Sequence, residues 1–592
     1  MKITDNSQIT NGRKDRPLNS PAFSAAWGRA LGIALLLFSA MPSYAGNRQV
    51  LNDGEAKFAR DLHSRTTGSG DMVTVIVQYR QMPNSAFLKN MKAGGAAIRF
   101  QHQAIRAVTM RVPASMLAVL AKDPNVAYIT PDRPVSMTDA NEQFSTAVEA
   151  DIMASQFALD GTGVGVAVID SGVADHGDLH TAGGASRVVY SQSFVAGDTT
   201  TSDKFGHGTH VAGLIGGNGA NSGTSNGYPA TYAGMASNVN LINLRVLDQN
   251  GVGTDSQVIA AIQQAIALKN TYNIRVINMS LGRPVFESYT LDPVNQAVEA
   301  AWKAGIVVVV AAGNNGRFWP TNGFATIGVP ANDPAVITVG ATRTLGTATR
   351  VDDTVASYSS KGPSVIDHIV KPDLVAPGNR LVSLRATGST LDKSYPQYAV
   401  GPASGTARYF VLSGTSMATP VVAGAAALLL QQNPSLTPDQ VKARLMKTAW
   451  KNFGQYSSSN DIRGNWYSNE YDVFTYGAGY LDINAALGNT DVATGLALSP
   501  TAVLNSNGTV TIVNTSSAAF GGTSVVWGAT SVVWGNSVVW GSNAITCNSV
   551  VWGATSVVWG ATSVSGYSVV WGATSTAASS MASLSDGDDG DN

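Results

Sequence analysis

A chain of 592 residues exceeds what one hydrophobic core usually supports, roughly 250 to 300 residues, so two or more folded units are expected. Apolar residues make up 44% and charged residues 13%, and the formal net charge is -1, which argues against nucleic acid or an acidic membrane surface as partner. Cys547 is the only cysteine, so no internal disulfide can form, and stability is left to packing and bound ions.

The first 45 residues have the pattern of an export signal. The basic residues Arg13, Lys14, Arg16 and Arg29 precede the apolar stretch 30–38, and Ser43-Tyr44-Ala45 offers small residues for cleavage. This stretch is shorter than the roughly 20 residues of a membrane-spanning helix, and no other uninterrupted apolar stretch of that length occurs. We predict a signal peptide over 1–45, export to the medium or the cell surface, and no transmembrane segment in the mature form.

A small α+β unit is predicted within residues 46–140. The β-branched runs Met72–Tyr79 and Ala107–Val112 indicate strands, and Pro113–Ala121 indicates a short helix before a last strand at Val126–Ile129. Taken alone, such a unit could be any small binding module.

Residues 141–488 alternate apolar runs with amphipathic helical patterns such as 257–269 and 294–304. This alternation predicts an α/β fold, a doubly wound and mostly parallel sheet with helices on both faces. The apolar runs end at polar or glycine-containing positions: Asp170, Ser280-Leu281-Gly282 and Gly313-Asn314. Ligand sites in open α/β sheets form at the carboxyl ends of strands, so these endings are expected to meet in one crevice.

Ser416 is the candidate nucleophile. It precedes the Ala/Leu-rich run 421–430, which has high helix propensity, so it is expected near a helix N-terminus, where unpaired N–H groups favour an oxyanion. Pro420 is placed in the first turn, where a missing N–H costs little. The alternative is a plain serine N-cap ahead of a buried helix.

His207, in Gly206-His207-Gly208-Thr209-His210, is the candidate base that would take the serine proton. The imidazole needs a carboxylate to hold its tautomer, and Asp170, in Asp170-Ser171-Gly172, can supply it. His210 is interpreted as structural. Alone, Asp-Ser-Gly after a strand also describes an ordinary strand-to-turn junction.

The three motifs occur in the order Asp, His, Ser, and in this the chain resembles the subtilisin-like serine proteases. The order differs from that of α/β-hydrolases and of chymotrypsin-like enzymes. The resemblance spans the catalytic region to about Tyr476–Asp482.

This resemblance implies a role for each matching position. Asp170 would be the orienting acid, His207 the general base and acid, Ser416 the acylated residue, and Asn314 the oxyanion donor. Without the rest of the pattern, Asn314 would be taken for a turn residue in Gly-Asn-Asn-Gly.

The resemblance also implies the residues that hold the substrate. Two extended segments would pair with it as an added strand, Gly251-Val252-Gly253 and Ser280-Leu281-Gly282. Ala311, Ala312 and Gly313 would form one wall of the pocket for the residue before the cut, and their small size favours a large apolar or aromatic residue there.

The chemistry implied requires no cofactor. Asp178 matches a calcium-ligand position of the family, and the stretch Gly217–Gly227 could offer carbonyl oxygens; a solvated loop is the alternative. Val421 departs from the histidine found there in several relatives, without touching a proposed catalytic role.

Ahead of such a site, residues 46–140 resemble the family's inhibitory propeptide, including the Asp123-Pro124-Asn125-Val126 turn and Pro131-Asp132. The resemblance implies an intramolecular inhibitor removed by self-cleavage near residues 135–150.

The tail, 489–592, contains an internal repeat. Ser-Val-Val-Trp-Gly occurs six times, starting at Ser524, Ser531, Ser537, Ser549, Ser556 and Ser568. Stacked short strands, binding of a polymer or cell surface through the tryptophans, and a disordered tail that is trimmed away all stay open. An acidic stretch, Asp586–Asp591, is expected to be solvated.

We therefore predict a secreted serine endopeptidase made as a self-processed zymogen, acting on proteins or peptides. The main alternative is a surface adhesion or scaffold protein in which the Trp-repeat tail is the working part. An esterase of the α/β-hydrolase type is less favoured, since Gly414-Thr415-Ser416-Met417-Ala418 lacks a glycine two positions after the serine.

Overall fold

The computed structural model describes residues 57–63, 71–136, 157–347, 349–454, 456–461, 464–504 and 510–513, and three short strands at 519–520, 524–525 and 545–547. These residues belong to one compact unit, Gly54–Asn592. The predicted signal peptide, most of the predicted self-cleavage region, the repeats after Val525 and the acidic end lie outside the described residues. No helix of the described part is long and apolar enough to cross a membrane.

Residues 71–131 form an antiparallel four-stranded sheet with two helices. In chain order the elements are β1 (Met72–Tyr79), α3 (Ser85–Ala93), β2 (Ala97–His102), β3 (Ala107–Pro113), α4 (Ala114–Lys122) and β4 (Val126–Pro131), and the strand order is β2-β3-β1-β4. The strands at β1, β3 and β4 and the helix α4 lie where the sequence predicts them. α3 and β2 were not predicted, because only Leu88 of α3 is buried and β2 is mostly exposed or half-buried.

The larger part of the described chain, which the sequence predicts to be catalytic, is built on an eight-stranded sheet in the order β13-β12-β11-β10-β6-β8-β7, with β14 also paired to β12. Its strands are β6 (Gly165–Asp170), β7 (Val188–Ser193), β8 (Asn240–Arg245), β10 (Ile274–Met279), β11 (Val307–Ala311), β12 (Ile337–Arg343), β13 (Thr354–Val355) and β14 (Leu374–Pro377). All pairings are parallel except that of β12 with β13. The central strands β6, β10 and β11 are buried almost throughout, which explains their unbroken apolar runs.

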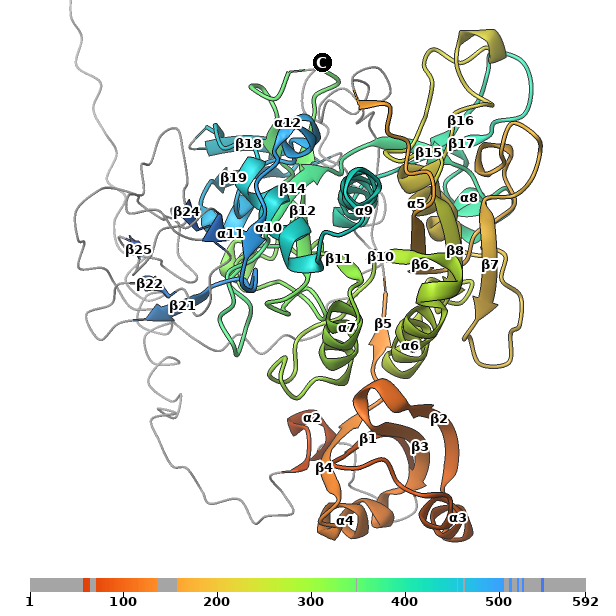
Figure 1. Cartoon of the computed structure of the whole chain (residues 1–592), viewed down its shortest axis with the longest axis vertical. Coiled ribbons are helices and arrows are strands. Elements are labelled where there is room, and N and C mark those ends of the chain that lie inside the picture. The colour runs from red at the N-terminus through yellow and green to blue at the C-terminus, as the bar shows by residue number, and fades with distance from the viewer. Residues whose placement is uncertain are drawn as a thin grey trace, which may run out of the picture. The chain divides into compact units, whose positions relative to one another are not determined.

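Helices cover both faces of this sheet, as the doubly wound prediction requires (Figure 1). α6 (Asp255–Tyr272) packs with α7 (Pro293–Lys303), and α5 (His207–Gly216) packs with α9 (Thr415–Gln432) on the other face. Local sequence sets where they begin: Thr254 and Gln257 form a capping box on α6, and Asp292 caps α7 ahead of Pro293. α9 is buried from Thr415 to Leu430, so it needs no polar face.

Pro420 does not lie in the first turn of α9, so that prediction was wrong. The helix begins at Thr415, one residue after Gly414, and Pro420 is inside it. A proline there cannot donate to the carbonyl of Ser416 four residues earlier. That carbonyl instead accepts a hydrogen bond from Ser280 Oγ at 2.8 Å, which ties the start of α9 to the end of β10.

The remaining elements are short connections and small sheets. They are α2 (Arg60–His63), η2 (Gln103–Ile105), β5 (Pro134–Val135), η5 (Gly177–Leu179), η6 (Thr224–Asn226), β9 (Gly253–Thr254), η7 (Trp319–Thr321), β15 (Leu381–Leu384), α8 (Thr390–Ser394), η8 (Pro396–Tyr398), β16 (Ala399–Val400), β17 (Tyr409–Leu412), α10 (Pro438–Thr448), β18 (Tyr456–Asn460), β19 (Trp466–Glu470), α11 (Val473–Tyr476), α12 (Ile483–Gly488), β20 (Ala493–Thr494), β21 (Thr501–Leu504), β22 (Val510–Val513), β23 (Ala519–Phe520), β24 (Ser524–Val525) and β25 (Ile545–Cys547).

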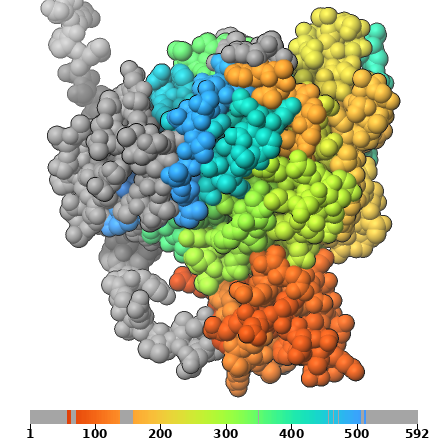
Figure 2. Space-filling view, viewed as in Figure 1, coloured from red at the N-terminus to blue at the C-terminus, as the bar shows by residue number. Residues whose placement is uncertain are grey.

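The chain after residue 488 packs onto the catalytic part as far as β21. Ser499 donates a 2.6 Å hydrogen bond to Asp373 and accepts one of 2.9 Å from Lys442, and all three side chains are buried. In Figure 2 the blue atoms near the end of the described chain lie directly against the cyan atoms before them. Residues 489–504 therefore help to close a buried ionic cluster.

We expect the Ser499→Ala substitution to lower the free energy of unfolding by about 1–3 kcal/mol, because it leaves Lys442 and Asp373 each short of a buried partner. Chemical unfolding of the full-length chain carrying Ser416→Ala measures this. The control is Ser435→Ala on the exposed surface, which should change stability by no more than about 0.5 kcal/mol. Equal effects of the two substitutions would contradict this assignment.

Candidate active site

Asp170 and His207 meet at the carboxyl end of the sheet. Asp170 is the last residue of β6 and His207 the first of α5, and both side chains are buried. His207 Nδ1 lies 3.0 and 3.1 Å from the two carboxylate oxygens. A proton on Nδ1 facing the carboxylate makes Nε2 the nitrogen that can accept a proton.

A second carboxylate, Asp203, supports this pair. Its Oδ1 accepts from the Gly206 N–H at 2.7 Å and its Oδ2 from the Thr209 N–H at 2.8 Å, so it caps the start of α5. Ser171 Oγ donates to Asp203 at 2.9 Å and accepts from the Gly208 N–H at 2.9 Å. Burial raises the pKa of Asp203, and hydrogen bonds from the helix oppose that shift. Asp203 was not predicted from the sequence, although an aspartate shortly before a predicted helix is a known capping signal.

Asn314, in the loop after β11, contacts the first residue of α9. Its Oδ1 accepts from the Thr415 N–H at 2.9 Å and from Thr415 Oγ1 at 3.1 Å. With Oδ1 so used, Nδ2 is the part of the amide that remains for another acceptor. Ser416 is the second residue of α9, so its own N–H has no partner within the helix. Asn314 Nδ2 and the Ser416 N–H are therefore two donors that the start of α9 does not use.

Ser416 Oγ donates to the carbonyl of Ser280 at 3.1 Å. Of the predicted catalytic residues, Asp170 ends β6, His207 begins α5, Asn314 follows β11 and Ser416 lies in the first turn of α9. Ser280, which contacts Ser416, directly follows β10. These side chains come from positions up to 246 residues apart, Asp170 and Ser416.

The chain's own residues Pro134–Ser136 lie between the two segments predicted to bind substrate. Val135 pairs antiparallel with Gly253, and Ser136 forms an antiparallel bridge with Gly282. The N–O distances between Ser136 and Gly282 are 3.1 and 3.4 Å. An extended chain therefore fits here as the middle strand of three.

The other predicted substrate residues lie along the same edge. Gly251 has a φ of 71° and a Cβ there would meet the Phe205 ring, so glycine is required at this turn. Val252 is exposed and Leu281 is buried. Ala311 ends β11, Ala312 and Gly313 follow it, and the Gly313 N–H donates to Thr415 Oγ1 at 3.1 Å.

Asp178 is buried, and both of its carboxylate oxygens are already hydrogen-bonded. Asn221 donates to Oδ1 through its backbone and its side chain, and Tyr409 donates to Oδ2 at 2.6 Å. Arg187 donates to the carbonyls of Asp178 and Gly216. Calcium takes six to eight oxygen ligands, and this donor-filled arrangement does not fit it. Among the described residues, no group of three or more His, Cys, Asp or Glu side chains could hold a metal ion.

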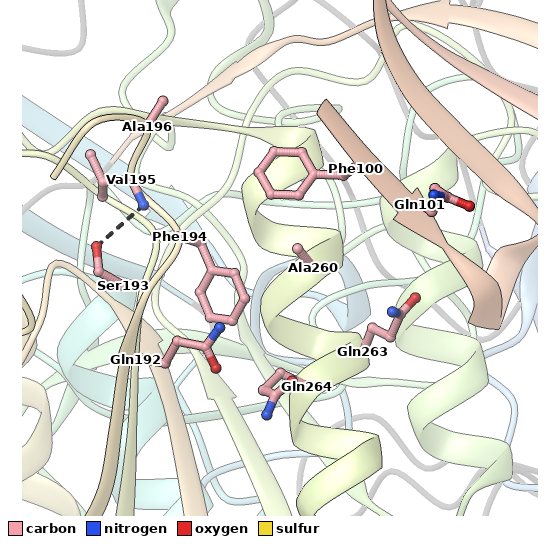
Figure 3. Close-up of a pocket in the computed structure, with 10 residues that line it drawn as sticks. All are labelled: Phe100, Gln101, Gln192, Ser193, Phe194, Val195, Ala196, Ala260, Gln263 and Gln264. Carbon is pink, nitrogen blue, oxygen red and sulfur yellow. Dashed lines mark hydrogen bonds between the residues drawn. The ribbon is translucent and has the colours of Figure 1, made fainter. Parts of the chain in front are cut away.

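A cavity of about 410 Å³ lies elsewhere, between β2, α6 and the loop after β7 (Figure 3). Phe100 and Gln101 line it from β2, Gln263 and Gln264 from α6, and Phe194 from the loop. None of the predicted catalytic residues lines it, so this cavity is separate from the candidate active site.

The sequence that carries these residues matches a known protein family. The profile described as the Subtilase family matches residues 161–479, which contain Asp170, His207, Asn314 and Ser416. The chain belongs to the subtilase family. It is a serine endopeptidase, and catalysis in this family needs no cofactor.

Curated relatives of this subtilase agree. It is 40% identical over 339 residues to serine protease AprX of Bacillus subtilis (strain 168), covering 56% of this chain and 71% of the relative. It is 37% identical over 341 residues to subtilisin DY of Bacillus licheniformis, covering 57% and 96%. It is 38% identical over 367 residues to the extracellular serine proteinase of Thermus sp. (strain Rt41A), covering 60% and 74%.

A solved structure with a similar fold is fervidolysin from Fervidobacterium pennivorans, described as a keratinolytic enzyme related to subtilisin. The TM-score is 0.53 at 22% identity, covering 77% of this chain and 68% of that one. At this identity the likeness shows the fold alone, and it agrees with the predicted α/β architecture.

His210, interpreted from the sequence as structural, is buried in α5 with Nε2 at 3.0 Å from the Leu381 carbonyl and 3.2 Å from that of Phe410. Burial, and to a lesser degree the neighbouring His207, lowers the pKa of His210 from 6.5 to about 3. The folded subtilase therefore keeps His210 neutral at pH values where the unfolded chain protonates it.

Between pH 6.5 and about 3 the unfolded state binds more protons, so His210 destabilises the fold as pH falls, by up to about 1.4 kcal/mol per pH unit. Urea unfolding of the full-length chain carrying Ser416→Ala, at pH 7 and pH 4.5, tests this dependence on pH. His210→Asn should be less stable at pH 7 but lose less stability on acidification. An equal loss of stability on acidification with and without His210→Asn would contradict this role of His210.

Proposed function

We propose that this subtilase cleaves peptide bonds through an acyl-enzyme on Ser416. The observation that carries the proposal is the buried Asp170–His207 pair, joined at 3.0 Å, at the edge of the sheet where the helix of Ser416 begins. Ser416 Oγ attacks the carbonyl carbon of the substrate while His207 Nε2 takes the hydroxyl proton. Asp170 holds the imidazole and stabilises its positive charge.

Two donors stabilise the oxyanion that forms, Asn314 Nδ2 and the Ser416 N–H. His207 then gives its proton to the leaving amine as the C–N bond breaks, which leaves the acyl ester on Ser416. Water, deprotonated by His207, hydrolyses that ester and restores the serine. The substrate is an extended protein or peptide chain between Gly251–Gly253 and Ser280–Gly282, with Ala311–Gly313 beside the residue before the cut.

We further propose that residues 46–140 are an intramolecular inhibitor of an exported zymogen. The support is that Val135 and Ser136 fill the strand position that a substrate needs. Asp132 adds to this, since its carboxylate accepts from Ser256 N–H at 2.8 Å and Ser256 Oγ at 2.7 Å at the start of α6. The extracellular Thermus relative supports export. Structural calcium, expected from Asp178 and the carbonyls of Gly217–Gly227, and the role of the tail are untested, although the hydrogen bonds at Asp178 speak against the first.

Replacing Ser416 with alanine removes the nucleophile, so we expect the precursor to persist at full length and casein digestion to be lost. Gel electrophoresis and N-terminal sequencing of the secreted protein follow the first effect, and a casein assay the second. Ser413→Ala, on a buried serine of the same turn, is the matched control and should still process. A Ser416→Ala protein that matures normally by itself would refute self-processing.

The Asn314→Ala substitution should lower kcat by about 10²–10³ with little change in KM, a range itself established on subtilisin, because it removes one oxyanion donor. Steady-state kinetics on a short chromogenic peptide measure this. Asn315→Ala, next in the chain and exposed, serves as control and should leave kcat nearly unchanged. A similar loss from both substitutions would assign Asn314 to loop structure instead.

A further inference from the structure

Glu287 is a buried carboxylate whose hydrogen bonds all lead to residues 128–133. Tyr128 donates to it at 2.9 Å, Thr130 at 3.2 Å, and the Arg133 guanidinium at 2.7 Å. Glu287 itself lies between β10 and α7, in the catalytic part. Once residues before the cut have been removed, these bonds to Glu287 are lost.

The guanidinium of Arg133 sits in a pocket formed by Phe286, Glu287 and Asp292, which we call the acidic pocket. Its carbon lies 5.1 Å from the centre of the Phe286 ring, and one nitrogen lies 3.9 Å from Asp292. Arg133 also pairs at 2.9 Å with Asp61, which belongs to the same N-terminal region and would leave with it. In the intact chain the Arg133 side chain is 1% exposed, because Asp61 and the acidic pocket together enclose it.

Among the described residues of the catalytic part, no cation forms an ion pair with Glu287. Arg283 is the nearby guanidinium, and it donates to Asp255 at 2.7 Å, to Asp292 at 2.6 Å and to the Pro284 carbonyl at 3.1 Å. Three carboxylates, of Asp255, Glu287 and Asp292, then share one arginine. Their surplus negative charge favours a new cation in the space that Arg133 vacates.

Arg133 immediately precedes the strand that occupies the substrate position. It lies three residues before Ser136, which pairs with Gly282. In an antiparallel register, the residue two after the partner of Gly282 faces Ser280, whose carbonyl accepts from Ser416 Oγ at 3.1 Å. A substrate bound in this register is cut after that residue, so its sixth residue before the cut reaches the acidic pocket.

We propose that the acidic pocket is a distal substrate subsite that selects arginine at the sixth residue before the cut. This inference rests on the proposed function, since it needs a substrate strand and a removable inhibitor. The subsites close to the cleaved bond bind mostly the substrate backbone. The acidic pocket would add a charge-dependent preference far from that bond. The planar guanidinium suits it better than lysine, because it can bond Glu287 and stack on Phe286 together.

The test uses mature enzyme and quenched fluorogenic peptides of one sequence, in which a single arginine or its neutral analogue citrulline is moved along the residues before the cut. Mass spectrometry locates the cut in each peptide. At the sixth position we expect kcat/KM to be about 10-fold higher for arginine than for citrulline, and at neighbouring positions about equal. The preference should shrink in 1 M NaCl, since salt screens charges.

Glu287→Gln should remove the arginine preference while cleavage of the citrulline peptide stays unchanged, and Glu287→Asp should keep part of it. Glu299→Gln, on α7 beside Lys303, is the matched control and should keep the full preference. If the Glu287→Gln protein does not mature, the comparison of arginine and citrulline peptides with wild-type enzyme still tests the preference at the sixth position.

Two results would overturn the subsite. Peptides that are cut at equal rates with arginine and citrulline at every position would overturn it while leaving the proposed function standing. Peptides that are not cut at all by mature wild-type enzyme would refute the proposed function and the subsite together.

Discussion

The site depends on the buried contact between Asp170 and His207. A carboxylate and an imidazole away from water are costly unless each is paired, so their pairing requires that the end of β6 and the start of α5 be held in place. Asp203 and Ser171 do this by binding the N–H groups at the start of α5. The capping of α5 therefore also fixes the position of His207, and with it the tautomer that Asp170 selects.

The other half of the site is held in a similar way. Pro420 leaves the carbonyl of Ser416 without its helical partner, and Ser280 supplies the missing hydrogen bond. Asn314 is fixed by Thr415. The nucleophile is therefore tied to β10 and to the loop after β11, so the catalytic geometry comes from the sheet edge rather than from any one loop.

The α/β fold and the candidate catalytic residues could be predicted from the sequence, because the sheet strands are buried on both faces and end at functional residues. The run before Asp170 and the glycine-flanked His207 are local signals of that kind. The support from Asp203 to Ser171, 32 residues apart, carries no periodic pattern. Glu287 was missed for the same reason, since its partners lie 154 to 159 residues away. Such contacts arise only once the chain has folded.

The proposed mechanism requires that Ser416, and no other serine, be activated by the imidazole of His207. Treating mature enzyme with a fluorophosphonate and mapping the adduct by peptide mass spectrometry tests this requirement. We expect one adduct per molecule, on Ser416, and its loss when His207 is replaced by alanine. An adduct on a different serine, or undiminished labelling without His207, would contradict the mechanism.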